Sequence, residues 1–168
     1  MDDKREIIIW RLELDKYIQD AFSGHGSARY PGRWNKAGDT VVYCSESLAL
    51  ATLEILVHLA GLDEMLKMPY FKVSATLAHD IGITEINPKA AANISKKWDA
   101  PSPPEELKAF GSQWYSEKKT PILKVPSVIV PEEYNFVINV RHPDAKTKID
   151  YGYPAPFKLD SRLGRSRK

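Results

Sequence analysis

Cysteine is almost absent from this chain of 168 residues, which contains only Cys44. A lone cysteine inside a β-branched and aromatic run has no disulfide partner and is expected to be a small core residue in a reducing compartment. This predicts a cytoplasmic protein. Together with the four scattered histidines, Cys44 offers no metal-ligand spacing, so we expect no metal site.

Long hydrophobic runs and an excess of one charge are missing as well. Residues 1–6 are mostly charged, and no apolar core of a signal peptide follows them. Glu54 and His58 interrupt the longest apolar stretch, so no membrane-spanning segment is expected. The net charge of +2 is too small to predict direct nucleic-acid binding. The basic side chains near the C-terminus are expected to be solvated: Arg162, Arg165, Arg167 and Lys168.

The segment Gly32–His58 organises the rest of the sequence. It begins with a turn rich in turn-forming residues, and the run Val41–Tyr43 then predicts a buried strand. Ser45 or Ser47 can cap the helix that follows, and Gly61 is expected just past its last turn. Apolar side chains cover most of the circumference of this helix, which predicts that it is buried nearly all round.

A narrow polar or small stripe on the same helix leaves two interpretations of Glu54. The stripe consists of Ser47, Ala51, Glu54 and His58. In one interpretation Glu54 and His58 form an i,i+4 pair in contact with solvent, worth roughly 0.2–0.5 kcal/mol. In the other, Glu54 is the carboxylate of a partly dry pocket that faces Arg33 and Tyr43. Spacing alone does not decide between them.

Outside this segment, alternating and periodic patterns predict short strands and a few helices. Strands are expected at residues 7–12, 70–77, 81–86, 122–130, 134–140 and 147–151, and helices at 14–22, 88–98 and 105–118. The sequence shows no regular βαβ repeat, no GxGxxG after a strand and no P-loop. We therefore predict an α+β fold of one compact domain, residues 1–168, with short mixed or antiparallel sheets and flanking helices.

Residues 23–35 form the segment best suited to bind phosphate. Ser23–Ser27 is a Gly/Ser loop whose backbone N–H groups could face an anion, and Arg29 and Arg33 follow it. A guanidinium donates two parallel hydrogen bonds to a phosphate. Arg11, at the end of the first predicted strand, extends either to solvent or toward a site.

With these residues identified, the sequence resembles the RES domain family, the toxins of Xre–RES toxin–antitoxin pairs. The resemblance covers nearly the whole chain in the right order, through Arg11, Ser23–Tyr30, Gly32–Asn35, Tyr43, Glu54 with His58, Gly111 with Trp114, Val125–Val128, Asn135 with Asn139, His142 with Pro143, and Phe157 with Asp160, Arg162 and Leu163. Two departures, Val140 and Ser161 at positions where the family often has proline, affect no polar candidate.

The resemblance implies a fold similar to that of ADP-ribosyltransferase toxins, with NAD⁺ as the substrate and no bound cofactor. The residues implied at the site are Glu54, Arg33 and Tyr43 as catalytic groups, and Arg11, Arg33, Tyr43, Ser127 and Asn139 as NAD⁺-binding groups. Simpler interpretations exist for three of them: Tyr43 as a core residue, Ser127 as a polar strand residue and Asn139 as a turn former.

Cleavage of the nicotinamide–ribose bond suits these residue types. The ribose develops positive charge while nicotinamide leaves as a neutral molecule, so a fixed negative charge such as Glu54 favours the reaction. Arg33 with Arg11 can hold the pyrophosphate, and Tyr43 can stack on nicotinamide. Ser127 can form a hydrogen bond with ribose or phosphate.

We therefore expect an enzyme that degrades NAD⁺ and transfers ADP-ribose to water or phosphate. Two alternatives stay open: ADP-ribosyl transfer to a protein target, and a non-catalytic module that binds a nucleotide or a partner peptide. No segment of the sequence is an evident self-inhibitor, so control is expected from outside. The resemblance implies an Xre-family antitoxin, a helix-turn-helix DNA binder, that forms a complex with this chain and occludes the active site.

Overall fold

The structure is a computed structural model that describes residues 6–59 and 62–164. Its strands are β1 (Ile7–Leu14), β2 (Val41–Ser45), β3 (Tyr70–Leu77), β4 (Ile83–Glu85), β5 (Ile122–Pro126), β6 (Tyr134–Asn139), β7 (Ile149–Tyr151) and β8 (Ala155–Phe157). Its helices are the 3₁₀-helix η1 (Asp15–Asp20), α1 (His25–Arg29), α2 (Leu48–Leu56), α3 (Leu62–Lys67), α4 (Pro88–Ile94), α5 (Glu105–Glu117), α6 (Pro143–Thr147) and the 3₁₀-helix η2 (Ser161–Gly164).

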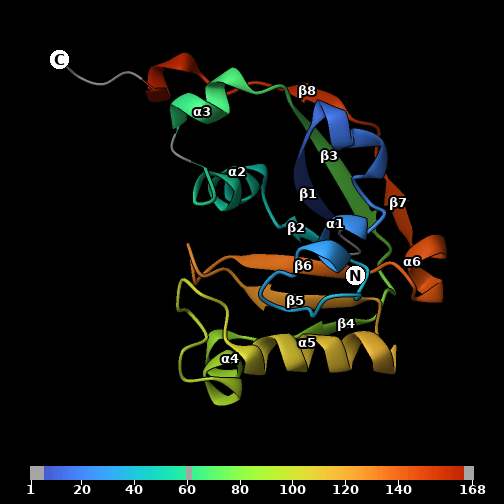
Figure 1. Cartoon of the computed structure of the whole chain (residues 1–168). Coiled ribbons are helices and arrows are strands. Elements are labelled where there is room, and N and C mark those ends of the chain that lie inside the picture. Colours follow the sequence, from blue (N-terminus) through green and yellow to red (C-terminus); the bar gives the residue numbers. More distant parts are fainter. Residues whose placement is uncertain (1–5, 60–61, 165–168) are drawn as a thin grey trace, which may run out of the picture.

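All eight strands belong to one mixed sheet. The order across the sheet is β4-β5-β6-β2-β1-β3-β7, and β8 also pairs with β3. Neighbouring strands are antiparallel except for β4 and β5, which are parallel. Helices α4 and α5 lie beside β4 and β5, at the opposite end of the molecule from α3 and β8 (Figure 1). This arrangement confirms the predicted α+β fold with a mixed sheet and flanking helices.

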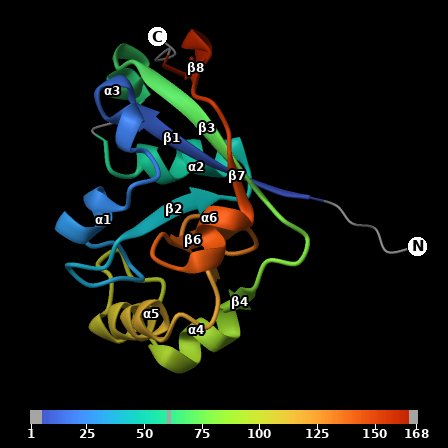
Figure 2. The ribbon, with the colours of Figure 1, turned by 90° about the vertical axis from the view of Figure 1, so that its right-hand side faces the viewer.

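Strand β1 is paired very differently on its two edges. Against β3 it forms a continuous antiparallel ladder from Ile7–Leu77 to Leu14–Tyr70. Against β2 the only registered pair is Trp10 with Ser45. The sheet therefore opens between β1 and β2, so that β1, β3 and β8 lie in one part of the molecule and β2, β6, α4 and α5 in the other (Figure 2).

Three clusters of buried side chains hold the sheet and the helices together. One lies on the face of the sheet formed by residues such as Ile9, Phe136 and Ile138. The second joins the opposite face of β5 and β6 to α4 and α5. The third, which includes Leu12 and Ala51, packs α2 and α3 against β1 and β3. Because Phe136 and Val137 alternate between the first two clusters, β6 is buried on both faces.

The contact between α5 and the loop before β2 is unusually close. A Cβ atom at Gly111 would lie 1.9 Å from the carbonyl oxygen of Trp34. Trp34 itself is buried and packs edge-on against Phe110 of the same helix. Gly111 therefore lets α5 approach the turn that carries Arg33, which explains the glycine in the motif Gly111-x-x-Trp114.

The predicted strands and helices are largely confirmed, but most of them are shorter than expected. The strand predicted at 122–130 ends at Pro126, because the chain then turns around Ser127. The helix predicted at 88–98 starts with the expected Asn87 cap and ends at Ile94. The segment 14–22 forms only η1, and part of the predicted loop Ser23–Ser27 belongs to α1. Helices α3, α6 and η2 and strand β8 were not predicted.

Helix α2 differs most from its prediction. Of the two predicted caps it is Ser47 that accepts a hydrogen bond from the Leu50 N–H, and the helix ends at Leu56. The predicted terminator Gly61 lies outside the described residues, as do Arg165, Arg167 and Lys168. The expectation of burial all round is wrong, since Leu53 and Val57 are 39% and 58% exposed. One side of α2 packs on β1 and the opposite side does not face the core. In the described ranges, every helix is too short or too polar to span a membrane.

Candidate active site

A cavity of about 810 Å³ lies where β1 and β2 separate. Both strands, one side of α2 and the loops around residues 31–34, 99–103 and 125–129 form its walls. Its size is in the range of pockets that hold nucleotide-sized ligands. Of the residues predicted for the site, the structure brings four to this cavity: Arg11, Arg33, Tyr43 and Glu54.

The turn that begins at Gly32 is built around the hydroxyl of Tyr43. Oδ1 of the fully buried Asn35 accepts hydrogen bonds from the Gly32 N–H (2.8 Å) and from the Tyr43 hydroxyl (2.9 Å). The same hydroxyl accepts one from the Trp34 N–H (2.9 Å). A Cβ atom at Gly32 would lie 2.8 Å from the Tyr43 ring, so only glycine permits this contact. Burial raises the pKa of Tyr43 far above its ordinary value, which keeps the phenol neutral.

Arg33 is anchored to a segment that is distant in the sequence. Its Nη1 donates to the Trp98 carbonyl and its Nη2 to the Ala100 carbonyl, each at 2.8 Å. Burial lowers the pKa of the guanidinium, while the negative charge of Glu54 opposes that shift. Nη2 also makes a long bond to the Pro101 carbonyl (3.5 Å). A guanidinium has five N–H donors, so these three carbonyl bonds leave others for a ligand. Arg33 thus has a second role that was not predicted, which is to hold the proline-rich connector at the cavity wall.

Glu54 is held by side chains from two other elements. Its Oε1 accepts hydrogen bonds from the Ser127 hydroxyl (2.9 Å) and from Nδ2 of Asn135. In the part of the chain that the structure describes, no residue donates to Oε2. The carboxylate lines the cavity together with Arg33 and Tyr43. Of the two interpretations of Glu54, the structure therefore shows the pocket carboxylate and not a surface pair with His58.

Ser127 and Asn139 are not among the residues that line this cavity in the described structure. Ser127 is fully buried behind Glu54, and its Oγ also accepts hydrogen bonds from the N–H groups of Ile129 and Val130. Asn139 is fully buried as well; its Nδ2 donates to the Tyr115 carbonyl (2.9 Å) and its Oδ1 accepts from the Arg141 N–H. The structure therefore places Ser127 in contact with Glu54. It places Asn139 elsewhere, near the C-terminal end of α5.

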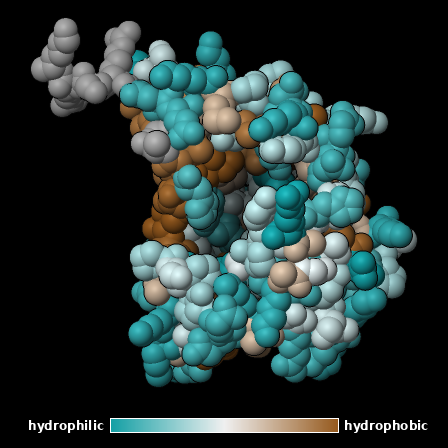
Figure 3. All heavy atoms as spheres, viewed as in Figure 1, coloured by the Kyte–Doolittle hydropathy of each residue, from teal (hydrophilic) through white to brown (hydrophobic). Residues whose placement is uncertain are grey.

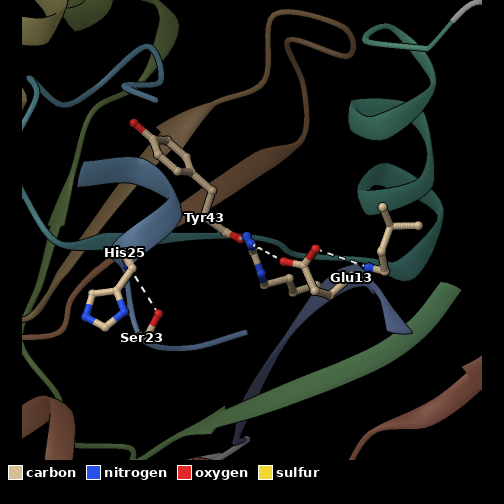
Figure 4. A network of polar contacts seen from close by, with 6 residues as sticks. Glu13, Ser23, His25 and Tyr43 are labelled. Carbon is tan, nitrogen blue, oxygen red and sulfur yellow. Dashed lines mark hydrogen bonds and ion pairs between the residues drawn. The ribbon is translucent and has the colours of Figure 1, made fainter. Parts of the chain in front are cut away.

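Arg11 reaches the cavity from β1 but is already paired. Its Nη1 donates to the Tyr43 carbonyl (3.0 Å) and its Nη2 to the Glu13 carboxylate (2.6 Å). The other oxygen of Glu13 accepts from the Leu14 N–H, so this carboxylate lies between the arginine and the backbone (Figure 4). The buried Nε of Arg11 has no hydrogen-bond partner among the described residues. Arg11 thus bridges β1 and β2 where the sheet opens.

Four polar residues of the cavity were not predicted as site residues: Ser45, His58, Asp99 and Asn135. Two of these, Ser45 and Asn135, lie on strands. Ser45 was considered only as a helix cap, and Asn135 was noted in a motif without a role. The signal that points to Ser45 and Asn135 is positional: each is a polar residue in a mostly apolar strand, and β2 and β6 pair them directly. Within the described residues, no group of three or more His, Cys, Asp or Glu side chains could hold a metal ion.

Comparison with known proteins places the chain in a family. A model of the RES domain matches residues 8–160. The chain belongs to the RES domain family. Among the relatives, the protein named Toxin Res of Photorhabdus laumondii is 36% identical over 162 residues, which cover 96% of this chain and all of that protein. The protein named Prs ADP-ribosylating toxin of a Sphingobium species is 39% identical over 139 residues, 82% of this chain and 84% of that protein.

The fold of this RES domain also resembles a solved structure. A chain of the M. tuberculosis MbcT–MbcA toxin–antitoxin complex superposes with a TM-score of 0.75 at 16% sequence identity, covering 92% of this chain and 86% of that one. At this identity the match shows the fold alone. It supports the predicted α+β fold with a mixed sheet and flanking helices.

The cavity combines a fixed carboxylate, a guanidinium, an aromatic ring and apolar walls. Such a set is complementary to a ligand that carries a negative group at one end and develops positive charge at the other. Because the carboxylate is held through one oxygen, it keeps the second available without rearrangement. Chemically, the site can stabilise positive charge that develops in a transition state.

Proposed function

We propose that this RES domain is a toxin that degrades NAD⁺ by cleaving the bond between nicotinamide and ribose. The observation that carries the proposal is Glu54, whose Oε1 is fixed by Ser127 and Asn135 while the carboxylate faces a cavity shared with Arg33 and Tyr43. The names of the relatives, Toxin Res and Prs ADP-ribosylating toxin, support the same class of function.

In the proposed reaction the C1′–N bond breaks and its electron pair stays on nicotinamide, which leaves as a neutral molecule. The ribose becomes an oxocarbenium-like cation, and the Glu54 carboxylate stabilises its charge. Arg33 holds the pyrophosphate with the donors that its carbonyl bonds leave free. The Tyr43 ring provides an apolar face for nicotinamide. An oxygen of water or phosphate then bonds to C1′, and water loses a proton in this step.

A second acceptor is favoured by one specific observation. The Sphingobium relative is named an ADP-ribosylating toxin, so transfer of ADP-ribose to a protein target is the alternative to water or phosphate. A non-catalytic binding module is the alternative of another class. Incubation of the purified protein with NAD⁺, with and without phosphate and with and without an added target protein, separates all three. Free ADP-ribose or its phosphorylated form supports the proposal, a labelled protein supports the second acceptor, and intact NAD⁺ after prolonged incubation supports the binding module.

We also propose that the chain is controlled by an antitoxin of the Xre family that occludes the cavity. The structural neighbour is a toxin–antitoxin complex. Hydrophobic side chains gather on the molecular surface over α2 (Figure 3), where Leu53 and Val57 are exposed and Val57 belongs to the cavity rim. Co-expression with the gene next door tests this proposal. If the product of that gene neither binds this chain nor suppresses its NAD⁺ turnover, the proposed pairing is contradicted, even if the chain does degrade NAD⁺.

A further inference from the structure

A row of directly paired residues crosses the sheet at the cavity. Trp10 of β1 pairs with Ser45 of β2, Ser45 with Asn135 of β6, and Asn135 with Val125 of β5. The row includes the single registered pair that joins β1 to β2. Ladders on both sides therefore fix the backbone positions of Ser45 and Asn135, at the point where the sheet begins to open.

The side chains of this row have a defined hydrogen-bond direction. The hydroxyl of Ser45, which is 4% exposed, donates to Oδ1 of Asn135 at 2.7 Å. A carboxylate can only accept, so the Asn135 amide must present its Nδ2 to Glu54. The bond from Ser45 requires the same amide orientation. Ser45 thus holds Asn135 with its donor directed at Oε1 of Glu54.

Ser127 directs a second donor to the same oxygen. Its Oγ accepts hydrogen bonds from the N–H groups of Ile129 (3.0 Å) and Val130 (3.2 Å), which leaves its own proton for Glu54. Both bonds to Glu54 have a charged acceptor and are of the stronger, more directional kind. Because they converge on Oε1, they fix the rotation of the carboxylate and leave Oε2 for a ligand.

We propose that Asn135, oriented by Ser45, is a positioning residue for Glu54 in the reaction. The inference rests on the proposed function, since it concerns the group that stabilises the ribose cation. That cation exists only in the transition state, so a misplaced carboxylate lowers kcat more than it changes KM. Misplacement of a reacting group by about 1 Å can cost about 10²-fold in rate.

The first test is a kinetic comparison of Asn135→Ala and Ser45→Ala with the wild type, measured as nicotinamide release from NAD⁺. We expect kcat to fall about 10²-fold in Asn135→Ala with little change in KM. In Ser45→Ala, which removes one hydrogen bond, the fall should be less than about tenfold. If Ser45 acts through Asn135, adding Ser45→Ala to Asn135→Ala should cause no further loss of kcat.

The second test uses pH with the isosteric variant Asn135→Asp. A carboxyl beside Glu54 can replace the amide donor only while one of the two groups holds a proton, since two like charges at this distance repel. We expect activity near that of Asn135→Ala at pH 8 and recovery as the pH is lowered toward 5. A residue with a purely structural role would give a loss that does not depend on pH. This variant also keeps the inference testable if Asn135→Ala fails to fold.

Thr120→Val is the matched control, because its part-buried hydroxyl makes hydrogen bonds with Trp114 and the Ile122 carbonyl away from the cavity. It should lower thermal stability without changing kcat. A wild-type kcat in Asn135→Ala would overturn the inference. So would strictly additive losses of kcat in the double variant together with no recovery at low pH in Asn135→Asp. The proposed function still stands in these cases if the wild type is active and Glu54→Gln is inactive. A wild-type protein that releases no nicotinamide overturns both.

Discussion

Two charged side chains of the cavity, Glu54 and Arg33, are held in different ways. Glu54 receives hydrogen bonds from side chains on the sheet and on the turn after β5. Arg33 donates to main-chain carbonyls of the connector between α4 and α5. The carboxylate is therefore positioned by groups that single substitutions can remove. The guanidinium positions a loop as much as the loop positions it, so changes at Arg33 affect binding and local structure together.

The largest expected effect comes from removing the negative charge of Glu54. Glu54→Gln keeps the volume, and its side-chain oxygen can still accept from Ser127 and Asn135, so the fold should survive. NAD⁺ turnover should fall by about 10²–10³, the loss typical of a missing electrostatic stabiliser. Nicotinamide release measures the effect, and thermal unfolding checks the fold. Turnover near wild type in a folded Gln variant would remove Glu54 from the mechanism.

Substitution of Arg33 should give the next largest effect. In Arg33→Lys the ammonium lacks the planar fork, so it cannot bond both the Trp98 and Ala100 carbonyls and still reach a phosphate. Arg33→Ala has no side-chain donor at all. We expect the Kd for NAD⁺ to rise about ten- to a hundredfold in both variants, as for the loss of hydrogen bonds to a charged group. A binding titration with the Glu54→Gln protein as background avoids turnover. Equal affinity of the Lys variant and its parent would make Arg33 a structural turn residue.

Ser127 distinguishes positioning from direct substrate contact. Ser127→Ala leaves the N–H groups of Ile129 and Val130 and one side of Glu54 without their partner, so the free energy of unfolding should fall by about 1–3 kcal/mol. Because Ser127 is buried behind Glu54, we expect kcat to decrease while KM for NAD⁺ stays near its wild-type value. Denaturant unfolding and steady-state kinetics measure the two effects, and Ser116→Ala, an exposed serine on α5, is the control. A raised KM with unchanged kcat would instead indicate that Ser127 contacts NAD⁺.

Substitution of Cys44 should give the smallest effect, a change of stability at alkaline pH, although Cys44 lines the cavity. Burial raises the pKa of its thiol to about 12, so the folded protein should resist thiol reagents at pH 7.5 and react only when unfolded. In the unfolded chain the thiol ionises near its ordinary pKa of about 8.5. Below that pH, ionisation of Cys44 does not lower the free energy of unfolding. Above it, the free energy of unfolding decreases progressively up to about pH 12. Cys44→Ala should reduce this alkaline loss in urea titrations but not abolish it, because Tyr151 also has a raised pKa of about 12.

Local patterns in the sequence predicted most of the secondary structure and part of the site. Asn87 with Pro88 marked the start of α4 correctly, because a cap depends only on neighbouring residues. Tyr43 and Glu54 were named as site candidates, and the structure brings both to one cavity. The extent of burial on α2 was predicted wrongly, because composition shows that Leu53 and Val57 are apolar but not whether anything in the chain covers them.

The two asparagines of β6 show what local patterns could not decide. Asn135 and Asn139 are four residues apart on one strand, so both side chains lie on the same face of the sheet. Helix α5 covers that face at Asn139, whose amide bonds the Tyr115 carbonyl, whereas Asn135 faces the cavity and bonds Glu54. The candidate named from the sequence was Asn139, and Asn135 had no assigned role.

The sequence by itself determined most of the strands and the longer helices, because side-chain alternation, caps and turn formers act over a few residues. It also carried the family's motifs in order, and with them the candidates Arg33, Tyr43 and Glu54. Only the tertiary structure decided where the sheet opens, since this depends on the single pair between Trp10 and Ser45 and on the register of β2 with β6. That opening placed Glu54 between Ser127 and Asn135, contacts that span 73 and 81 residues of sequence and leave no local pattern.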